Sequence, residues 1–282
     1  MLASASPVEV VVVDNASTDE SVRLLREAHG SEPRLTLVEN RRNLGFARAC
    51  NQGLVRSNGN DILLLNPDAV LPPHGIARLR AALEAHPGAG MAGPLLVSPD
   101  GREQNGCRRD LPQLGTAFSH AFAVPRPLRS RLGGDFVHAG EPLPAGPVPV
   151  EAISGACMLV RKAAIDAVGP LDEGYFLHCE DLDWCARFHA AGFGVLFVPE
   201  VTVVHDMGVS CRRRPIFAEW HKHRGMLRYY GRFLRPRHSA VAAAAVATGI
   251  GLRFVGVALR GIGARAWSRG GARPWSHGRT SH

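Results

Sequence analysis

The stretch VVVVDNASTDE, residues 10–20, decides the fold class of this chain of 282 residues. The four consecutive valines Val10 to Val13 are typical of a strand that is buried on both faces of a parallel sheet. The run stops at Asp14-Asn15, and Ser17-Thr18-Asp19-Glu20 then matches a capping box that begins a helix. A buried strand followed directly by a helix is the repeating unit of an α/β domain.

The same alternation continues along the chain. Short apolar runs predict strands at residues 35–38, 61–65, 91–97, 156–160, 195–198 and 201–204. Apolar residues at helical spacing predict helices at residues 43–54, 75–85 and 180–191. The alternation therefore predicts an α/β domain, doubly wound around a mostly parallel central sheet.

Three segments depart from this pattern. Residues 104–149 are rich in Pro, Gly and Arg, and we interpret them as a variable loop region. Residues 236–263 contain the uncharged stretch Ser239 to Leu252, which predicts an apolar, membrane-associating helix. That stretch is shorter than the roughly 20 residues of a membrane span, so a peripheral contact is expected. Residues 264–282 are rich in Gly, Arg and Ser, which predicts a disordered basic tail.

Charge is divided unevenly along the chain. Residues 1–204 carry 18 basic and 23 acidic side chains, whereas residues 205–282 carry 15 and 2. A basic C-terminal region beside an apolar helix fits anionic lipid, and no recognised nucleic-acid motif accompanies it, so nucleic acid is not an expected partner. The six cysteines form no C-x-x-C pair, and no secretory signal is visible. We therefore expect buried, reduced thiols in a cytoplasmic protein.

Carboxylates follow the buried strands, where α/β folds bind their ligands. Asp14-Asn15 can bind the edge of a nucleobase, or it can simply shape the turn. Asn66-Pro67-Asp68 suits a hard divalent cation that also binds phosphate oxygens, although the same residues are common in turns. His205 ends the strand at 201–204 and would complete a Mg²⁺ or Mn²⁺ pair if it lies near Asp68.

A third acidic motif, Glu180-Asp181-Leu182-Asp183-Trp184, begins the helix predicted at 180–191. The helix dipole favours one or two acidic residues in a first turn, but it does not account for the whole motif. A carboxylate held next to a substrate hydroxyl can act as a general base. The motif is therefore a candidate catalytic site.

Taken in order, these motifs resemble the inverting family 2 glycosyltransferases, in particular the bacterial rhamnosyltransferase-like branch, which has Asn-Pro-Asp where relatives have Asp-x-Asp. The resemblance covers about residues 8–235. The residues that carry it are Val10 to Asp19, Asn43 to Ala47 with Asn51 and Gly53, Leu64 to Ala69, Ser154 to Leu159, Gly169 to Glu173, and Glu180 to Asp183.

The resemblance implies a GT-A fold over residues 1–235, with a nucleotide-binding half at 8–100 and an acceptor and catalytic half at 150–205. It implies transfer of a sugar from a nucleotide-diphosphate donor, dTDP-rhamnose or a UDP-sugar, with inversion. The acceptor would be a hydroxyl of a glycan or of a polyprenyl-linked molecule in bacterial cell-envelope polysaccharide synthesis. The enzyme would work at the cytoplasmic face of the inner membrane.

The family's site residues carry over one by one. Asp181 matches the catalytic base, and Asp68 and His205 match ligands of a divalent metal, Mg²⁺ or Mn²⁺. The donor pocket would include Asp14, Asn15, Asn43, Asn51 and Asn66. The acceptor site would be shaped by Gly155, Ala156, Glu180, Asp183 and Trp184.

The sequence departs from the family at its start. Relatives have an earlier strand and helix, and the nine residues before Val10 are too few to form both. We therefore expect two unpaired strand edges and weak nucleotide binding that an upstream extension would strengthen. The alternative function is that of a catalytically impaired relative that binds nucleotide or a partner enzyme. A Rossmann dehydrogenase is not expected, because no G-x-G-x-x-G follows the Val10 strand.

Overall fold

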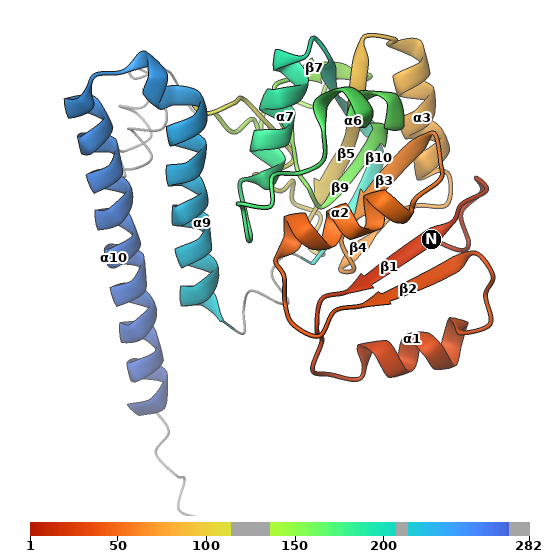
Figure 1. The fold of residues 1–282 in the computed structure, drawn as a ribbon, viewed down its shortest axis with the longest axis horizontal. Helices are drawn as coiled ribbons and strands as arrows, with labels where there is room; N and C mark the ends of the chain where they lie inside the picture. The colour runs from red at the N-terminus through yellow and green to blue at the C-terminus, as the bar shows by residue number, and fades with distance from the viewer. Residues whose placement is uncertain (114–135, 207–213, 271–282) are drawn as a thin grey trace, which may run out of the picture.

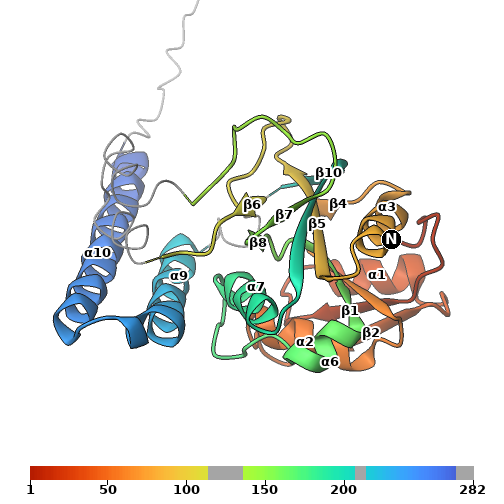
Figure 2. The same ribbon diagram turned by 90° about the horizontal axis from the view of Figure 1, so that it is seen from above.

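The computed structural model describes residues 1–113, 136–206 and 214–270, with side chains as far as residue 261. An α/β body contains the strands, and a hairpin of two long helices stands beside it (Figures 1 and 2). The predicted α/β class with a helical C-terminal extension is confirmed.

The N-terminal residues form a separate small sheet. Strand β1 (Val10–Asp14) pairs in parallel with β2 (Leu35–Glu39), and α1 (Ser21–His29) connects them. Within the described residues, this pair forms no ladder with the main sheet, and β3 (Asp61–Leu65) stands at the end of the main sheet. One edge of β1 and one edge of β3 therefore have no strand partner in the described chain, as the sequence predicts.

The main sheet has the strand order β3-β9-β5-β10-β4, and β7 also pairs with β10. Its ladders are antiparallel except β5–β10, so the sheet is mixed, and the predicted predominance of parallel strands is not found. Strand β9 runs antiparallel to β3 and β5, and β4 runs antiparallel to β10. The sequence pattern did not predict these directions. The strands are β4 (Ala69–Val70), β5 (Ala89–Val97), β7 (Val148–Val150), β9 (Cys157–Arg161) and β10 (Gly194–His205).

Two local predictions need correction. The helix α1 begins at Ser21 rather than after Ser17. Its N-cap residue Glu20 makes no side-chain capping hydrogen bond, and Asp19 Oδ1 accepts the Ser21 amide at 3.2 Å. The two strands predicted at 195–198 and 201–204 form one strand, β10, whose register shifts between Val198 and Thr202. That β-bulge is the interruption that the sequence pattern placed between two strands.

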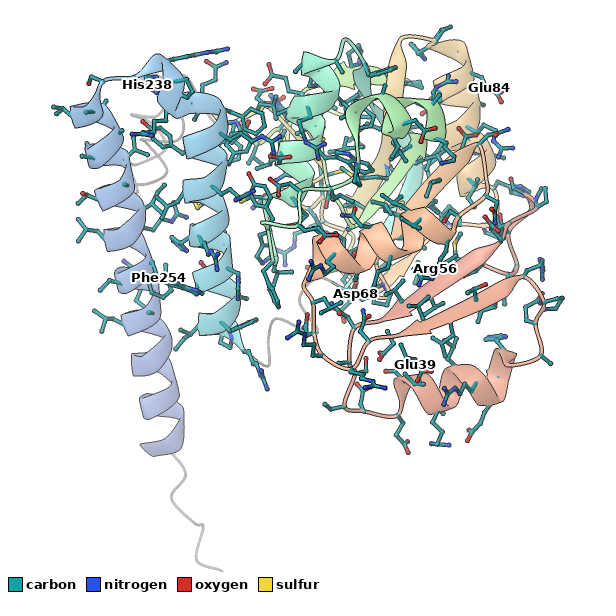
Figure 3. All side chains as sticks on the ribbon, in the orientation of Figure 1. Glu39, Arg56, Asp68, Glu84, His238 and Phe254 are labelled. Carbon is teal, nitrogen blue, oxygen red and sulfur yellow. The ribbon has the colours of Figure 1, made fainter. Side chains whose placement is uncertain are left out.

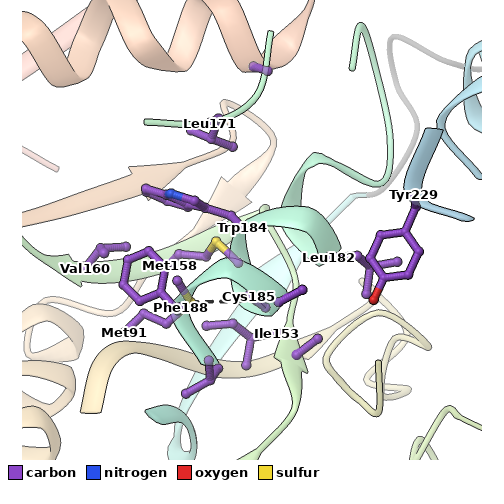
Figure 4. Packing of buried hydrophobic residues seen from close by; sticks show 14 of the residues in the cluster. Met91, Ile153, Met158, Val160, Leu171, Leu182, Trp184, Cys185, Phe188 and Tyr229 are labelled. Atoms are coloured by element: carbon purple, nitrogen blue, oxygen red, sulfur yellow. Dashed lines mark hydrogen bonds between the residues drawn. The ribbon is translucent and has the colours of Figure 1, made fainter. Parts of the chain in front are cut away.

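Helices cover the main sheet and bury its apolar faces. Helix α3 (Gly75–Ala85) packs on β5 and β10. Helix α7 (Glu180–Ala190) supplies Trp184 and Phe188 to the cluster of buried apolar side chains that Figure 4 shows. Gly90 on β5 allows the close approach of Phe188, since a Cβ there would lie 2.7 Å from the ring. The remaining helices of the body are α2 (Phe46–Arg56) and α6 (Lys162–Val168).

The segment predicted as a loop at 104–149 contains regular structure in its described part. Strand β6 (Arg108–Arg109) pairs with β8 (Ala152–Ile153), and β7 begins at Val148. Periodicity missed these strands because each has only two or three residues. Residues 114–135 of the segment lie outside the described residues.

The helical hairpin consists of α9 (Pro215–Tyr229) and α10 (Ala240–Gly270), joined through a π-helical turn (Tyr230–Leu234) and a 3₁₀ turn (Arg235–Arg237). Phe254 of α10 points toward α9 (Figure 3), and its ring lies 5.3 Å from that of Trp220. Residues 264–270, expected in a disordered tail, are helical, whereas 271–282 lie outside the described residues.

The apolar part of α10 is longer than the sequence reading predicted. Residues 240–261 have a mean hydropathy of 1.8 and are long enough, by length and composition alone, to cross a membrane. The shorter prediction ended the apolar stretch at Leu252 because Arg253 follows. A single arginine does not end a helix, since its long side chain can reach toward polar surroundings.

Candidate active site

The predicted donor residues of the N-terminal half meet at the end of β1. The Asn15 side chain donates to Asn43 Oδ1 at 3.0 Å and to the Gly45 carbonyl at 3.1 Å, and it accepts the Leu44 amide at 2.9 Å. The Asp14 carboxylate accepts the Ser17 amide at 3.2 Å. Asn15 therefore holds the 43–45 loop beside the Asp14 carboxylate.

Asn51 does not join this group in the hydrogen bonds of the described residues. Its Oδ1 accepts the Leu171 amide at 3.0 Å, and its Nδ2 donates to the Leu171 carbonyl at 2.9 Å and to Glu173 at 3.2 Å. Both ends of the buried amide are thus occupied by the 171–173 segment. The geometry assigns Asn51 to the attachment of α2 rather than to contact with the donor.

Asp68 lies at the lower end of the main sheet in Figure 3. The next residues form β4, which pairs with the end of β10, where His205 lies. His205 Nε2 is 3.1 Å from Asp68 Oδ1, and Asn66 Nδ2 lies 3.4 Å from the same nitrogen. The pairing of His205 with Ala69 in the β4–β10 ladder brings the histidine next to Asp68. The juxtaposition that the sequence left conditional is present.

Gln104 sets the hydrogen-bonding state of His205. Its Nε2 donates to the His205 carbonyl at 2.6 Å, which leaves Gln104 Oε1 as the acceptor 2.8 Å from His205 Nδ1. Nδ1 must then carry a proton, and the Nε2 lone pair of a neutral ring points at the Asp68 carboxylate. Two acceptor atoms that face each other at 3.1 Å need a cation between them, either a proton or a metal ion.

The same residues fit a divalent metal. Besides the carboxylate and the imidazole, Asn66 Oδ1 is buried and has no hydrogen-bond partner. Carboxylate, amide and imidazole ligands suit Mn²⁺, and oxygen ligands suit Mg²⁺. Within the described residues, no group of three or more His, Cys, Asp or Glu side chains is placed to hold a metal, so further ligands would come from substrate or water.

Asp181, at the start of α7, is largely buried and strongly paired. Its Oδ2 accepts from Arg109 Nη2 at 2.6 Å and from the Gly155 amide at 3.3 Å, and its Oδ1 accepts the Leu182 amide at 2.8 Å. Burial by itself would raise the pKa of Asp181, but the Arg109 guanidinium and these hydrogen bonds outweigh it and lower the pKa below its usual range. Asp181 is therefore ionised at neutral pH.

Glu180 has the opposite protonation state. Burial, and then the neighbouring Asp181 carboxylate, raise the pKa of Glu180 to about 8. Its Oε2 is buried without a hydrogen-bond partner, and its charge adds to burial in raising the pKa of Cys50 on α2 to about 12. At neutral pH the adjacent pair thus holds one proton on Glu180 and one charge on Asp181.

Asp183 and Trp184 do not line the site, and the prediction that they contact an acceptor is corrected. Both are fully buried. Asp183 accepts from Arg187 at 2.7 Å and from Arg232 at 3.0 Å, and Trp184 donates to the Gly169 carbonyl at 2.9 Å. Asp183, two positions after Asp181, faces another side of the helix. Trp184 packs into the core against Phe188 (Figure 4).

Contacts connect the three carboxylates across the site. The Asn66 amide donates to the Ala156 carbonyl at 2.9 Å, and the next residue back, Gly155, donates to Asp181. A Cβ at Gly155 would touch Asp181 Cβ at 3.4 Å and the Phe46 ring at 3.6 Å. Since Phe46 follows the 43–45 loop, Gly155 and Ala156 lie between the Asp14 loop, the Asp68 turn and Asp181.

The sequence patterns did not predict two residues of the site, Gln104 and Arg109. Both belong to the 104–149 segment, which was interpreted as a variable loop. A buried carboxylate needs a cationic or hydrogen-bonding partner, so Asp181 signals that a partner exists. That requirement does not say which of the 33 basic residues provides it.

Solved structures with the same architecture are GT-A glycosyltransferases. A mannosyltransferase from Pyrobaculum calidifontis, solved with GDP-Man and Mn²⁺, matches with a TM-score of 0.53 and 18% identity, covering 94% of this chain and 73% of that chain. GalNAc-T7, solved with UDP, GalNAc and Mn²⁺, matches with a TM-score of 0.55 and 16% identity, covering 79% of this chain and 41% of that chain. The chain therefore has the GT-A fold.

The chain belongs to glycosyl transferase family 2, whose characteristic sequence matches residues 2–132. It is 32% identical over 251 residues to N-acetylglucosaminyl-diphospho-decaprenol L-rhamnosyltransferase of Mycobacterium tuberculosis, covering 84% of this chain and 78% of the relative. The dTDP-rhamnosyl transferase RfbF of Shigella flexneri is 25% identical over 205 residues, covering 71% and 60%. Within the family, the chain is rhamnosyltransferase-like.

Proposed function

We propose that this glycosyltransferase moves a sugar from a nucleotide-diphosphate donor to a hydroxyl acceptor by a single displacement that inverts the anomeric centre. The observation that carries the proposal is that the ionised Asp181 accepts the Gly155 amide, while the next residue, Ala156, accepts the Asn66 amide through its carbonyl. Two adjacent residues thus connect Asp181 with the Asn66-Pro67-Asp68 turn. A base and a diphosphate site must lie on opposite sides of the sugar for in-line attack.

Asp181 is the proposed general base. It would accept the proton of the acceptor hydroxyl as that oxygen attacks the anomeric carbon and the bond to the nucleoside diphosphate breaks. Arg109 keeps Asp181 ionised and oriented, and neutral Glu180 adds no second negative charge beside it. Gly155 leaves room for a sugar because no side chain extends from the position that Asp181 and Phe46 flank.

Asp68 and His205 are the proposed ligands of a divalent metal, Mg²⁺ or Mn²⁺, with Asn66 beside them. A metal held there would offset the charge that develops on the leaving diphosphate. Gln104 orients the histidine, because its hydrogen bond with Nδ1 of His205 leaves Nε2 facing Asp68. Asp14, with Asn15 and Asn43, would bind the nucleobase.

The donor is proposed to be dTDP-rhamnose, with a UDP-sugar as the alternative. The support is the likeness to proteins named as rhamnosyltransferases, one of which names a diphospho-decaprenol acceptor. We further propose a glycan or polyprenyl-linked acceptor of cell-envelope synthesis, used by a cytoplasmic enzyme that sits peripherally on the inner membrane. The apolar residues 240–261 and the basic C-terminal region support membrane contact.

The test is a transfer assay with the whole chain. Radiolabelled dTDP-rhamnose and UDP-sugars are offered in turn, with N-acetylglucosaminyl-diphospho-polyprenol in detergent, with Mn²⁺ or with EDTA. Transfer of one sugar, abolished by EDTA and by D181N, is expected. Donor binding without transfer in any combination would overturn the proposal and favour the catalytically impaired relative.

A further inference from the structure

The loop before α7 is held in a strained conformation. His178 and Cys179 have φ values of 69° and 71°, so two consecutive non-glycine residues occupy the left-handed region. This conformation is unfavourable for a residue with a side chain, and it persists only when neighbouring structure enforces it. Because Glu180-Asp181 follow directly, the strained pair sets where α7 begins and where the Asp181 carboxylate lies.

Helix α9 provides the enforcing contact at Gly225. A Cβ at this position would lie 2.9 Å from the His178 carbonyl oxygen and 3.3 Å from Cys179 Cβ. These distances are too short for any residue but glycine, so α9 touches the loop with its backbone. Gly231, in the π-helical turn that follows α9, has open space around the same position.

Aromatic residues extend this contact along one face of α9. The His221 ring stacks on Phe176 at 4.3 Å, and Phe217 meets the His221 ring at 4.4 Å. Phe217, His221 and Gly225 are spaced four residues apart and thus share a face of the helix. Phe176 in turn accepts the Phe46 amide at 2.7 Å through its carbonyl.

We propose that the face of α9 formed by Phe217, His221 and Gly225 is a positioning element for the catalytic base. It holds the 176–179 loop in its strained conformation and thereby fixes Asp181 between Arg109 and Gly155. The inference rests on the proposed role of Asp181. Helix α9 would then take part in the reaction, although none of its residues lies in the sequence motifs that resemble the family.

The test compares G225A with G231A in the whole chain. In G225A the new methyl group pushes α9 and the loop apart. A displacement of catalytic groups by about 1 Å can cost about 10²-fold in rate, so we expect kcat to fall about 10- to 100-fold. The KM for the donor should stay within about threefold, because the clash is at residues 178 and 179, whereas the Asp14 carboxylate is held by the Ser17 amide. G231A should match the wild type in both constants.

Amide hydrogen exchange tests the same proposal without enzyme activity. In G225A, the amides of residues 176–182 should exchange at least tenfold faster than in the wild type, while those of β5 and β9 should not change. Equal kcat and equal exchange in G225A and G231A would overturn the proposal. A wild-type chain without transferase activity would count against the proposed function alone, because the exchange comparison still stands.

A second variant covers the case in which G225A does not fold. H221A removes the ring that stacks on Phe176 and adds no clash, so it should lower kcat about threefold to tenfold and speed exchange in the same loop. W220A is its control, since Trp220 contacts Phe254 of α10 on the other side of α9. If H221A and W220A behave alike in kcat and in loop exchange, α9 does not position the base.

Discussion

Asp68 and Asp181 are the same residue type in one site, but their surroundings differ in a way that separates their proposed roles. Asp181 faces a guanidinium, which is always charged, and its side chain is 15% exposed. Asp68 faces the imidazole of His205, and its side chain is 23% exposed. A carboxylate with a permanent cation partner stays ionised and can accept a proton, whereas Asp68 Oδ1 and His205 Nε2 can share either a proton or a metal ion. The partner, rather than the carboxylate, therefore sets the role.

The largest expected effect is that of D181N. The amide cannot accept a proton from the acceptor hydroxyl, so kcat should fall about 10³-fold while the affinity for the nucleotide donor changes little. Initial rates and donor titration by calorimetry measure the two quantities. D166N, at an exposed position on α6, is the control. A loss of less than tenfold in D181N would remove Asp181 from the role of base.

The next largest effect is expected for D68N, which tests the other half of the comparison. Mn²⁺ binding, measured by electron paramagnetic resonance in the presence of nucleoside diphosphate, should weaken more than tenfold, and kcat should fall about 10²-fold. D61N changes the opposite end of β3, where Asp61 pairs with Arg80 at 3.0 Å, and should bind Mn²⁺ normally. Equal Mn²⁺ affinity in the two variants would exclude Asp68 as a metal ligand.

Replacing Arg109 should make the two carboxylates more alike. In R109Q the pKa of Asp181 should rise, because the guanidinium that lowers it is gone. The acid limb of the rate profile should then move upward by about one pH unit, so the loss should approach about tenfold only on the acid side of the limb and should be small at pH 8.5. R108Q removes the neighbouring arginine, which pairs with Glu103, and should leave the limb in place. An unmoved limb in R109Q would show that Arg109 does not control the base.

The smallest effect concerns the stability of the fold. Glu180 has a pKa of about 8 in the folded protein against 4.5 for an ordinary glutamate, so the folded state binds the extra proton between these values. Stability is therefore highest below pH 4.5 as far as this group is concerned, and it falls as the pH rises toward 8. E180Q removes the titration. Its Tm should exceed that of the wild type by several degrees at pH 8.5 and match it at pH 5, as calorimetry can check.

Much of the fold followed from short-range patterns in the sequence. The helix at 75–85 and the strand at 61–65 have the predicted bounds, because apolar periodicity and turn residues act over a few positions. The mixed pairing of the sheet was not predicted, since register and direction depend on partners that are far away in the chain. The strands β6 and β8 were missed because two residues are too few to show a periodicity, and Arg109, which lies in β6, was missed with them.

The candidate site also combines residues that local sequence patterns indicate with residues that they do not. Asp14, Asp68, Asp181 and His205 could be selected as candidates from the sequence, because carboxylates after buried strands and at a helix start are local features. The partners of His205 and Asp181 could not be predicted from the sequence. Gln104 is 101 residues away from His205 in the chain, and Arg109 is 72 residues away from Asp181. Asp183 and Trp184 share a motif with Asp181, yet helical geometry directs them into the core.

The sequence by itself determined the fold class, the family and the residue types available for chemistry, since these depend on the order of the motifs along the chain. Only the tertiary structure decided which carboxylate is ionised, which is neutral and which lies beside a histidine. The physical reason is that a pKa and a metal site depend on burial and on charges within a few ångströms. Those neighbours come from segments that the fold, and not the local sequence, brings together.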